Sequence, residues 1–101
     1  SVGFDGGVEV KFDASALIPL VAKLGQYLRT GFDQYVTLRA SGIDPSPELV
    51  AAFLETKMAT WNPRVRGQEV LDDETRAACA RFLGGVAYNI ASAQKQNGEA
   101  A

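Results

Sequence analysis

The feature that most limits how this chain can fold is an apolar pattern of three- and four-residue steps in its first half. Because an α-helix turns once every 3.6 residues, such steps gather the apolar side chains on one face. The residues in the pattern are Leu17, Leu20, Val21, Leu24, Tyr27, Leu28, Gly31, Phe32, Tyr35 and Leu38. We therefore expect a long amphipathic helix over 15–41, with Gly42 at its C-terminal cap and Pro19 either near the end of the first turn or at a kink.

Two further helices are predicted from their end signals. In the run Ser46-Pro47-Glu48 the serine can cap, the proline takes the first helical position and the glutamate meets the positive end of the helix dipole. Asn62-Pro63 ends this pattern, which predicts a helix over 46–61. The acidic run 72–74 opens a third helix, which we expect to cover 72–96.

Residues 1–12 have the alternation of a β-hairpin instead. Val8, Val10 and Phe12 alternate with charged residues, and the preceding Asp5-Gly6-Gly7 suits a tight turn. Such a hairpin packs on its own bundle, pairs with a missing part of a longer parent protein or pairs between subunits, because two strands alone are marginal in water. The expected fold is mainly α, a three-helix bundle with a short N-terminal β-hairpin. With 101 residues and 10.8 kDa, it forms one domain over 1–101.

The expected core combines the apolar positions of the three helices. It consists of Leu24, Leu28, Phe32, Phe53, Leu54, Phe82, Val86 and Ile90. The third helix also carries a stripe of small residues, Ala77, Ala80, Gly84, Ala87 and Ala91. Small side chains let another helix approach closely, so the first helix fills this groove through Gly25 and Gly31 or the stripe makes a homotypic helix contact.

The composition removes most catalytic chemistry. Histidine is absent and Cys79 is the only cysteine, which excludes histidine-based triads, zinc sites built from His or Cys, and internal disulfides. Cys79 is expected to be an inert core residue, and capping explains the acidic run 72–74 better than acid–base catalysis does. We therefore predict that the protein is not an enzyme and has no catalytic residue, metal or cofactor.

Charge and hydropathy describe an acidic chain without a membrane signal. Ten Lys and Arg against twelve Asp and Glu give a formal net charge of -2, which does not attract polyanions. The longest nearly apolar stretch, 16–22, contains Pro19 and is too short to cross a bilayer, and no signal-peptide pattern occurs. We expect a cytoplasmic location and no membrane partner. The start at Ser1 without Met favours a domain excised from a longer protein.

The segment 61–71 is longer than the usual helix connection and contains the only tryptophan. Tryptophan and arginine contribute most often to binding energy at interfaces. The candidate binding residues are therefore Trp61, Asn62, Arg64 and Arg66. The alternative is structural: Trp61 anchors the second helix to the core, and the arginines are solvated or paired with acids. The acids in question are Glu55, Glu69 and Asp72.

These observations favour a non-catalytic protein-interaction or assembly module. It would bind a protein partner, with homo-oligomerisation as the simplest case, through a helical surface and the 61–71 loop. The alternative is a nucleic-acid-binding domain, or an accessory subunit of a nucleic-acid enzyme, that uses Lys57, Arg64 and Arg66. Nucleic acid is the second choice as a partner, since domains that depend on phosphate contacts are usually basic.

Overall fold

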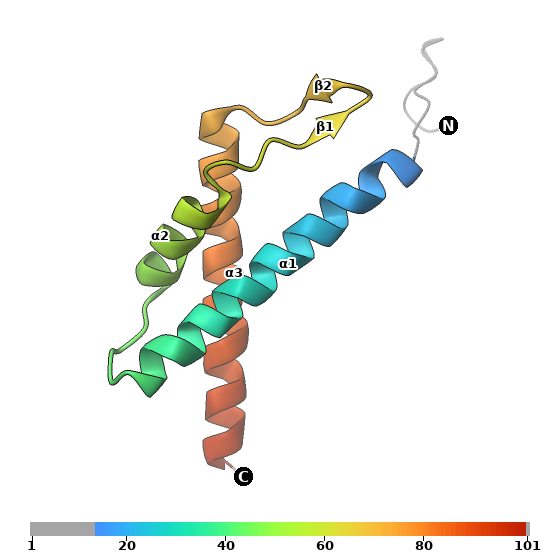
Figure 1. The fold of residues 1–101 in the computed structure, drawn as a ribbon. Helices are drawn as coiled ribbons and strands as arrows, with labels where there is room; N and C mark the ends of the chain where they lie inside the picture. The colour runs from blue at the N-terminus through green and yellow to red at the C-terminus, as the bar shows by residue number, and fades with distance from the viewer. Residues whose placement is uncertain (1–13, 101) are drawn as a thin grey trace, which may run out of the picture.

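The computed structural model describes residues 14–100 of the chain, with side chains placed for Ser15 and for 17–94. Three helices and one small sheet follow each other along this part of the chain (Figure 1). Their bounds are α1 Ala14–Ala40, α2 Pro47–Met58, β1 Arg64–Val65, β2 Gln68–Glu69 and α3 Asp73–Ala100. The prediction of a mainly helical fold with three helices is confirmed for these residues.

The β-hairpin of the structure lies between α2 and α3, so its predicted place at the N-terminus is wrong. In this hairpin Val65 faces Gln68 across an antiparallel pair. The turn residues Arg66 and Gly67 have φ values of 56° and 79°, the backbone that a two-residue type I′ turn requires. Strands of two residues are too short to show alternation, which is why the sequence pattern missed them. The hairpin predicted over 1–12 lies outside the described residues.

The end of α1 is the cap that its sequence predicts. The Ile43 N–H donates to the Leu38 carbonyl at 2.9 Å, and the Gly42 N–H donates to the Arg39 carbonyl at 3.0 Å. Together with a φ of 78° at Gly42, these bonds form a Schellman motif. Pro19 lies inside α1, five residues after its start at Ala14 and so beyond the first turn, and a kink at this proline stays a prediction.

The other two helices also begin where their caps place them. Ser46 Oγ accepts the Leu49 N–H at 3.1 Å ahead of α2, and Asp72 Oδ1 accepts the Thr75 N–H at 2.7 Å ahead of α3. However, α2 ends at Met58 rather than at 61. Proline at position 63 disfavours helical backbone just before it, and Trp61 leaves the helix to pack on the core. The third helix continues to Ala100, four residues beyond its predicted end at 96.

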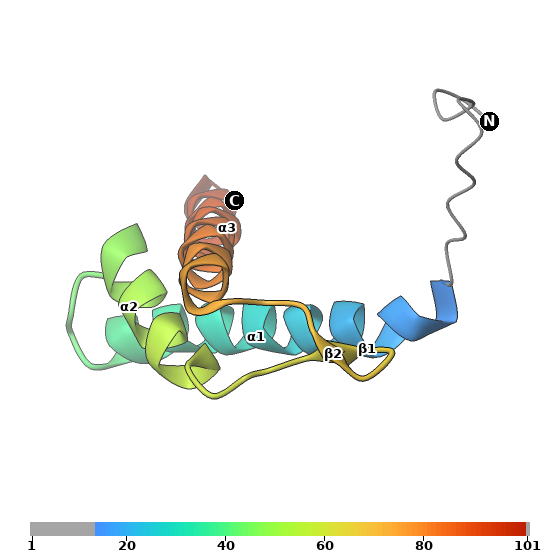
Figure 2. The same cartoon turned by 90° about the horizontal axis from the view of Figure 1, so that it is seen from above.

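The two long helices cross, and α2 packs along one side of the crossing (Figures 1 and 2). At about 1.5 Å per residue, α1 and α3 are each roughly 40 Å long, whereas α2 is roughly 18 Å long. A core shared by all three helices therefore covers only part of the length of α1 and α3. Figure 2 shows that the N-terminal half of α1 runs past α3, on the side of α3 that α2 does not occupy.

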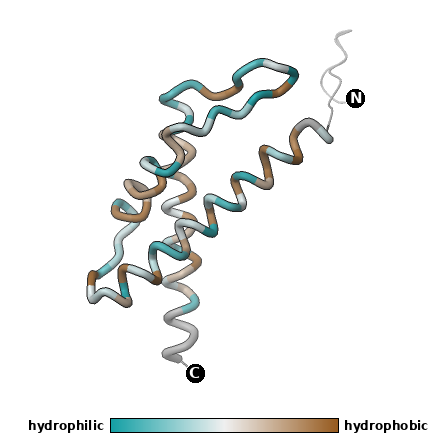
Figure 3. The backbone as a smooth tube through the Cα atoms, viewed as in Figure 1, coloured by the Kyte–Doolittle hydropathy of each residue, from teal (hydrophilic) through white to brown (hydrophobic). Residues whose placement is uncertain are grey.

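The core is built from large side chains of α2 against small side chains of α3. The largest fully buried side chains are Leu54, Met58 and Val50, all on α2. In Figure 3 apolar and polar colours alternate along α1 and α2, as expected for helices with one side against a core. The buried residues form two clusters, one of Tyr35, Val50, Ala87 and Ala91 and one of Leu54, Met58, Ala80 and Leu83.

Four small residues of α3, here called the packed stripe, face this core: Ala80, Gly84, Ala87 and Ala91. A Cβ added to Gly84 would lie 2.6 Å from Ala51 Cα of α2, and one added to Gly31 of α1 would lie 3.0 Å from Ala87 Cβ. Both α1 and α2 therefore approach α3 closely at this stripe. Of the glycines proposed to fill the groove, Gly31 does so, whereas a Cβ at Gly25 would meet nothing within 4 Å.

The predicted core is wrong for Phe82 and Ile90 of α3 and largely right for the rest. Leu54 is buried, and Leu24, Leu28 and Phe32 are half-buried against the two clusters. Phe53 and Val86 are also half-buried. In contrast, Phe82 is 70% exposed and Ile90 is 41% exposed. The physical reason is that α3 turns its packed stripe and Leu83 inward, where the small residues allow two helices to approach at once, and this rotation leaves Phe82 and Ile90 outside.

Candidate functional site

Trp61, the first of the candidate binding residues, acts as an anchor within the fold. Its ring is half-buried and packs against the cluster around Leu54. It also meets the Tyr27 ring of α1 edge-on, with centroids 5.5 Å apart and an interplanar angle of 60°. The indole therefore ties the end of α2 to α1.

Asn62 is held by a buried arginine that the sequence did not single out as structural. Arg76 of α3 is 7% exposed, and its Nη2 donates to Asn62 Oδ1 and, at 3.4 Å, to the Leu71 carbonyl. Its Nε donates to the Trp61 carbonyl at 2.6 Å. Its Nη1 pairs with Asp73 Oδ1 at 2.8 Å. One guanidinium thus joins both ends of the 61–71 segment to α3, and no sequence pattern marks it, because two of its four acceptors are backbone carbonyls and a third lies 14 residues away.

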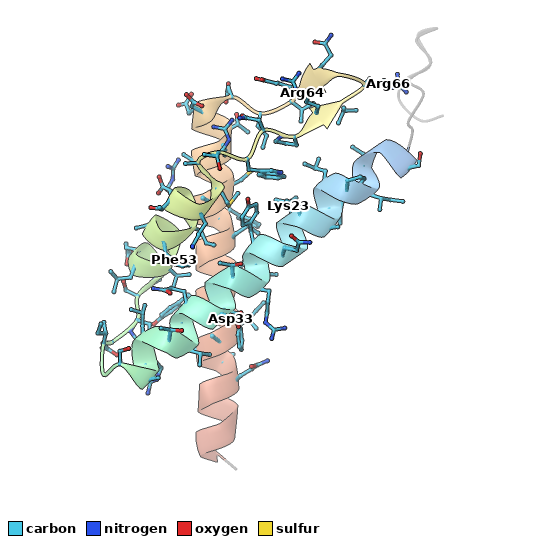
Figure 4. All side chains as sticks on the ribbon, viewed as in Figure 1. Lys23, Asp33, Phe53, Arg64 and Arg66 are labelled. Atoms are coloured by element: carbon cyan, nitrogen blue, oxygen red, sulfur yellow. The ribbon has the colours of Figure 1, made fainter. Side chains whose placement is uncertain are left out.

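The two arginines of the hairpin have different surroundings (Figure 4). Arg64 Nη2 pairs with Glu69 Oε2 at 3.2 Å, and Arg64 Nη1 donates to the Gly67 carbonyl at 3.2 Å. Both side chains of this pair are more than half exposed, so the pair contributes about 1 kcal/mol or less. Arg66 is exposed at the turn and makes no hydrogen bond or ion pair with any other described residue. Of the four candidates, Arg66 is therefore the one without a hydrogen-bond or ion-pair partner among the described residues.

Two further cationic side chains, Lys57 and Arg81, lie near aromatic or acidic residues. Lys57 Nζ of α2 lies 5.3 Å from the centroid of the Phe53 ring, a cation–π distance. Arg81 of α3 lines an open groove of about 290 Å³ together with Glu48 and Glu55. The cations are therefore divided among α2, the hairpin and α3, next to acidic or aromatic groups.

A second candidate surface lies on α3, and the sequence analysis had assigned most of it to the core. We call it the outer face of α3 and define it as Cys79, Phe82, Val86, Ile90 and Ala93. At 3.6 residues per turn these positions fall within an arc of about 80°, roughly 130° around the helix from the packed stripe. Phe82 and Ile90 are its large exposed members, Ala93 is exposed and Val86 is half-buried, while Cys79 at its edge is half-buried against the core cluster around Leu54.

The apolar surface continues from Ile90 onto α1. A groove of about 320 Å³ separates the two helices there, and it is lined by Gly25, Leu28, Arg29, Phe32, Ile90 and Gln94. Further along α1, Ile18 is 64% exposed and Val21 is 63% exposed. These two residues line another shallow hollow, of about 420 Å³, with Leu17 and Ala22. Large apolar side chains are thus exposed on both long helices.

The chemistry of this surface suits burial of apolar groups. From Phe82 to Gln94 the sequence contains no charged residue, although α3 is a helix with only one side covered by α1 and α2. This uncharged run is the signal from which the surface could have been predicted, because interface cores are depleted of charge. Among the described residues, no group of three or more His, Cys, Asp or Glu is placed to hold a metal ion. None of the described helices combines the length and hydropathy needed to cross a bilayer.

The chain was compared with protein-family models, curated proteins and solved structures. None of the three comparisons found a match.

Proposed function

We propose that this domain is a non-catalytic protein-interaction module that associates through the outer face of α3 and the adjoining apolar surface of α1. An exposed apolar patch on a folded domain marks a surface that another molecule covers. The residues available here are aromatic and aliphatic, with one thiol and no histidine in the chain. Such a surface supplies area for binding rather than a nucleophile or a general base.

The observation that carries this proposal is the contrast between two neighbouring residues of α3. Leu83 is 9% exposed, whereas Phe82 is 70% exposed in the middle of a regular helix. Leaving a phenylalanine in water forgoes about 1.5–3 kcal/mol of burial free energy. Covering Phe82 together with Val86 and Ile90 recovers that free energy on association, which makes this face the most favourable place for a partner.

The contribution of the 61–71 segment remains a prediction. Trp61 and Asn62 contact α1 and α3, and Arg64 pairs with Glu69 of the same hairpin, so a partner would meet Arg66 most directly. Binding of nucleic acid through Lys57, Arg64 and Arg66 also remains a prediction. What weighs against it is that Glu69 pairs with Arg64 and that the chain is acidic overall.

Site-specific photo-crosslinking in the source cells tests the proposal. The photoreactive residue p-benzoylphenylalanine replaces Phe82 in one variant, Arg66 in a second and Ala52 in a third. Ala52 is an exposed residue of α2 and serves as the control. We expect a discrete crosslinked protein from position 82 that is absent from position 52.

The crosslinked protein is identified by mass spectrometry and its binding to the purified chain is measured. We expect Phe82→Glu to weaken that binding at least about 100-fold and Ala52→Glu to leave it unchanged, because a charge is costly only in a desolvated contact. A specific crosslink from position 66 alone would move the function to the 61–71 loop. No crosslink from position 82 would contradict a role for the outer face of α3.

A further inference from the structure

We propose that the partner of the outer face of α3 is a second copy of this chain, whose α3 packs antiparallel with the two-fold axis beside Val86, an inference that rests on the proposed function. Two-fold dimers are the commonest assemblies of soluble proteins, and their interface must be complementary to itself. The outer face of α3 meets that condition in spacing, charge and area.

The spacing of the outer face is symmetric about Val86. Along the chain its members are separated by three, four, four and three residues: Cys79, Phe82, Val86, Ile90 and Ala93. In an antiparallel pair centred on Val86, Phe82 faces the partner's Ile90 and Cys79 faces the partner's Ala93. Large residues then meet large ones and small residues meet small ones, which gives a continuous contact without a gap.

Charge favours a copy of this chain and the antiparallel arrangement. No charged residue lies between Phe82 and Gln94, so the face meets its own copy without repulsion despite the net charge of -2. A parallel pair would bring together the acidic runs 72–74 of both chains at the helix starts. The antiparallel pair keeps them apart and places each helix start near the C-terminal end of its partner, where the dipoles attract.

The outer face of α3 alone is too small for a stable dimer interface, so apolar surface of α1 must contribute to it. A standard interface removes about 800 Å² from each partner, and the stretch 79–93 of one helix is only about 21 Å long. Phe82 alone exposes 70% of an aromatic side chain, a class that buries roughly 150–250 Å². Ile90, the groove beside it and the exposed Ile18 and Val21 of α1 extend this apolar area beyond the single helix. The partner helix would lie in the angle between α3 and the N-terminal half of α1 (Figure 2).

The mass of the purified 101-residue chain in solution is the first test. Sedimentation equilibrium at tens of micromolar should give twice 10.8 kDa for the wild type. Phe82→Glu should reduce the mass to 10.8 kDa, whereas Ala52→Glu on α2 should remain dimeric. Circular dichroism of each variant at the same concentration confirms that the helices are intact. A dimer that survives Phe82→Glu with unchanged affinity would place the interface elsewhere.

Disulfide trapping tests the orientation and needs no charged substitution. Ala93→Cys retains Cys79, and mild oxidation should convert it to a two-subunit band on a non-reducing gel. The wild type, with Cys79 alone, and Ala52→Cys should remain single chains under the same oxidation. Crosslinking of the wild type through Cys79 would show a parallel pair and overturn the antiparallel arrangement.

Different results would contradict the proposed interaction function and the proposal that the partner is a second copy of this chain. A wild type that is monomeric at millimolar concentration overturns the second copy as partner. If position 82 still crosslinks to another protein in cells, the proposed interaction function survives that result. If position 82 crosslinks to nothing and the chain is monomeric, both proposals are wrong.

Discussion

The two faces of α3 differ in a way that hydrophobicity alone does not explain. The packed stripe consists of alanine and glycine and is buried against α1 and α2. The outer face carries a phenylalanine and an isoleucine and is largely exposed. Small residues are inside because they allow two helix backbones to approach at once, while α2 supplies the large side chains that fill the core. Burial on α3 therefore follows shape as well as hydrophobicity, and it leaves Phe82 and Ile90 exposed.

Truncation of neighbouring residues on the two sides should give the largest difference. Leu83→Ala should lower the free energy of unfolding by about 2–5 kcal/mol, because it removes buried methyl groups. Phe82→Ala should change it by less than about 1 kcal/mol at a dilution where the chain is monomeric, because Phe82 is already solvated. Urea denaturation followed by circular dichroism measures both values. Equal losses would show that the two faces do not differ in burial.

Substitution of Arg76 tests whether its hydrogen bonds to the 61–71 segment fix the orientation of α3 about its own axis. Arg76→Lys keeps the charge, but one ammonium cannot reach the acceptors at Trp61, Asn62 and Leu71 together. We expect a loss of about 1.5–3 kcal/mol and a red shift in the emission of Trp61, the only tryptophan. Arg81→Lys, at an exposed position of the same helix, is the control. Unchanged emission and stability would show that Arg76 does not hold the segment.

Substitutions at two adjacent glycines of α3 test how closely α2 approaches the packed stripe. Gly84→Ala places a Cβ 2.6 Å from Ala51 Cα, so α2 must move away, at a cost of about 1–3 kcal/mol. Gly85→Ala meets nothing within 4 Å and should gain about 0.5–1 kcal/mol from the better helix propensity of alanine. Thermal unfolding of the two variants should therefore shift in opposite directions. Shifts of the same sign would contradict the close approach of α2 and α3.

The smallest expected effect is the pH dependence of the cap that begins α3. The Thr75 hydroxyl and then the Thr75 backbone N–H hold the pKa of Asp72 below its ordinary value of 3.8. Because the folded pKa is the lower one, the cap contributes its full stability above pH 3.8 and loses it as the pH falls through the folded pKa.

Asp72→Asn isolates this effect, since asparagine caps a helix without titrating there. The difference in unfolding free energy between the wild type and Asp72→Asn should shrink as the pH falls from 6 to 2. Circular dichroism during urea denaturation at each pH measures it. A difference that does not change with pH would show that Asp72 caps without the predicted ionic contribution.

The sequence predicted the helices well because helix ends are local. The Gly42 cap involves residues at most five positions apart, and the Ser46 and Asp72 caps act across three. The hairpin was missed because strands of two residues carry no periodicity. The role of the four residues proposed in 61–71 stays a prediction, although Trp61 and Asn62 contact α1 and α3, whereas Phe82 and Ile90 on the outer face of α3 were wrongly assigned to the core.

The sequence by itself determined that the described chain forms three helices, where they begin and end to within a few residues, and that histidine chemistry is absent. Only the tertiary structure decided which of the two apolar stripes of α3 faces inward. Both stripes have helical spacing, so the choice depends on distant contacts. The close approach of Gly84 to Ala51 is one, and the hydrogen bond from Arg76 to the Trp61 carbonyl, 15 residues away, is another. Such contacts depend on the complementary shapes of three helices, which no local pattern encodes.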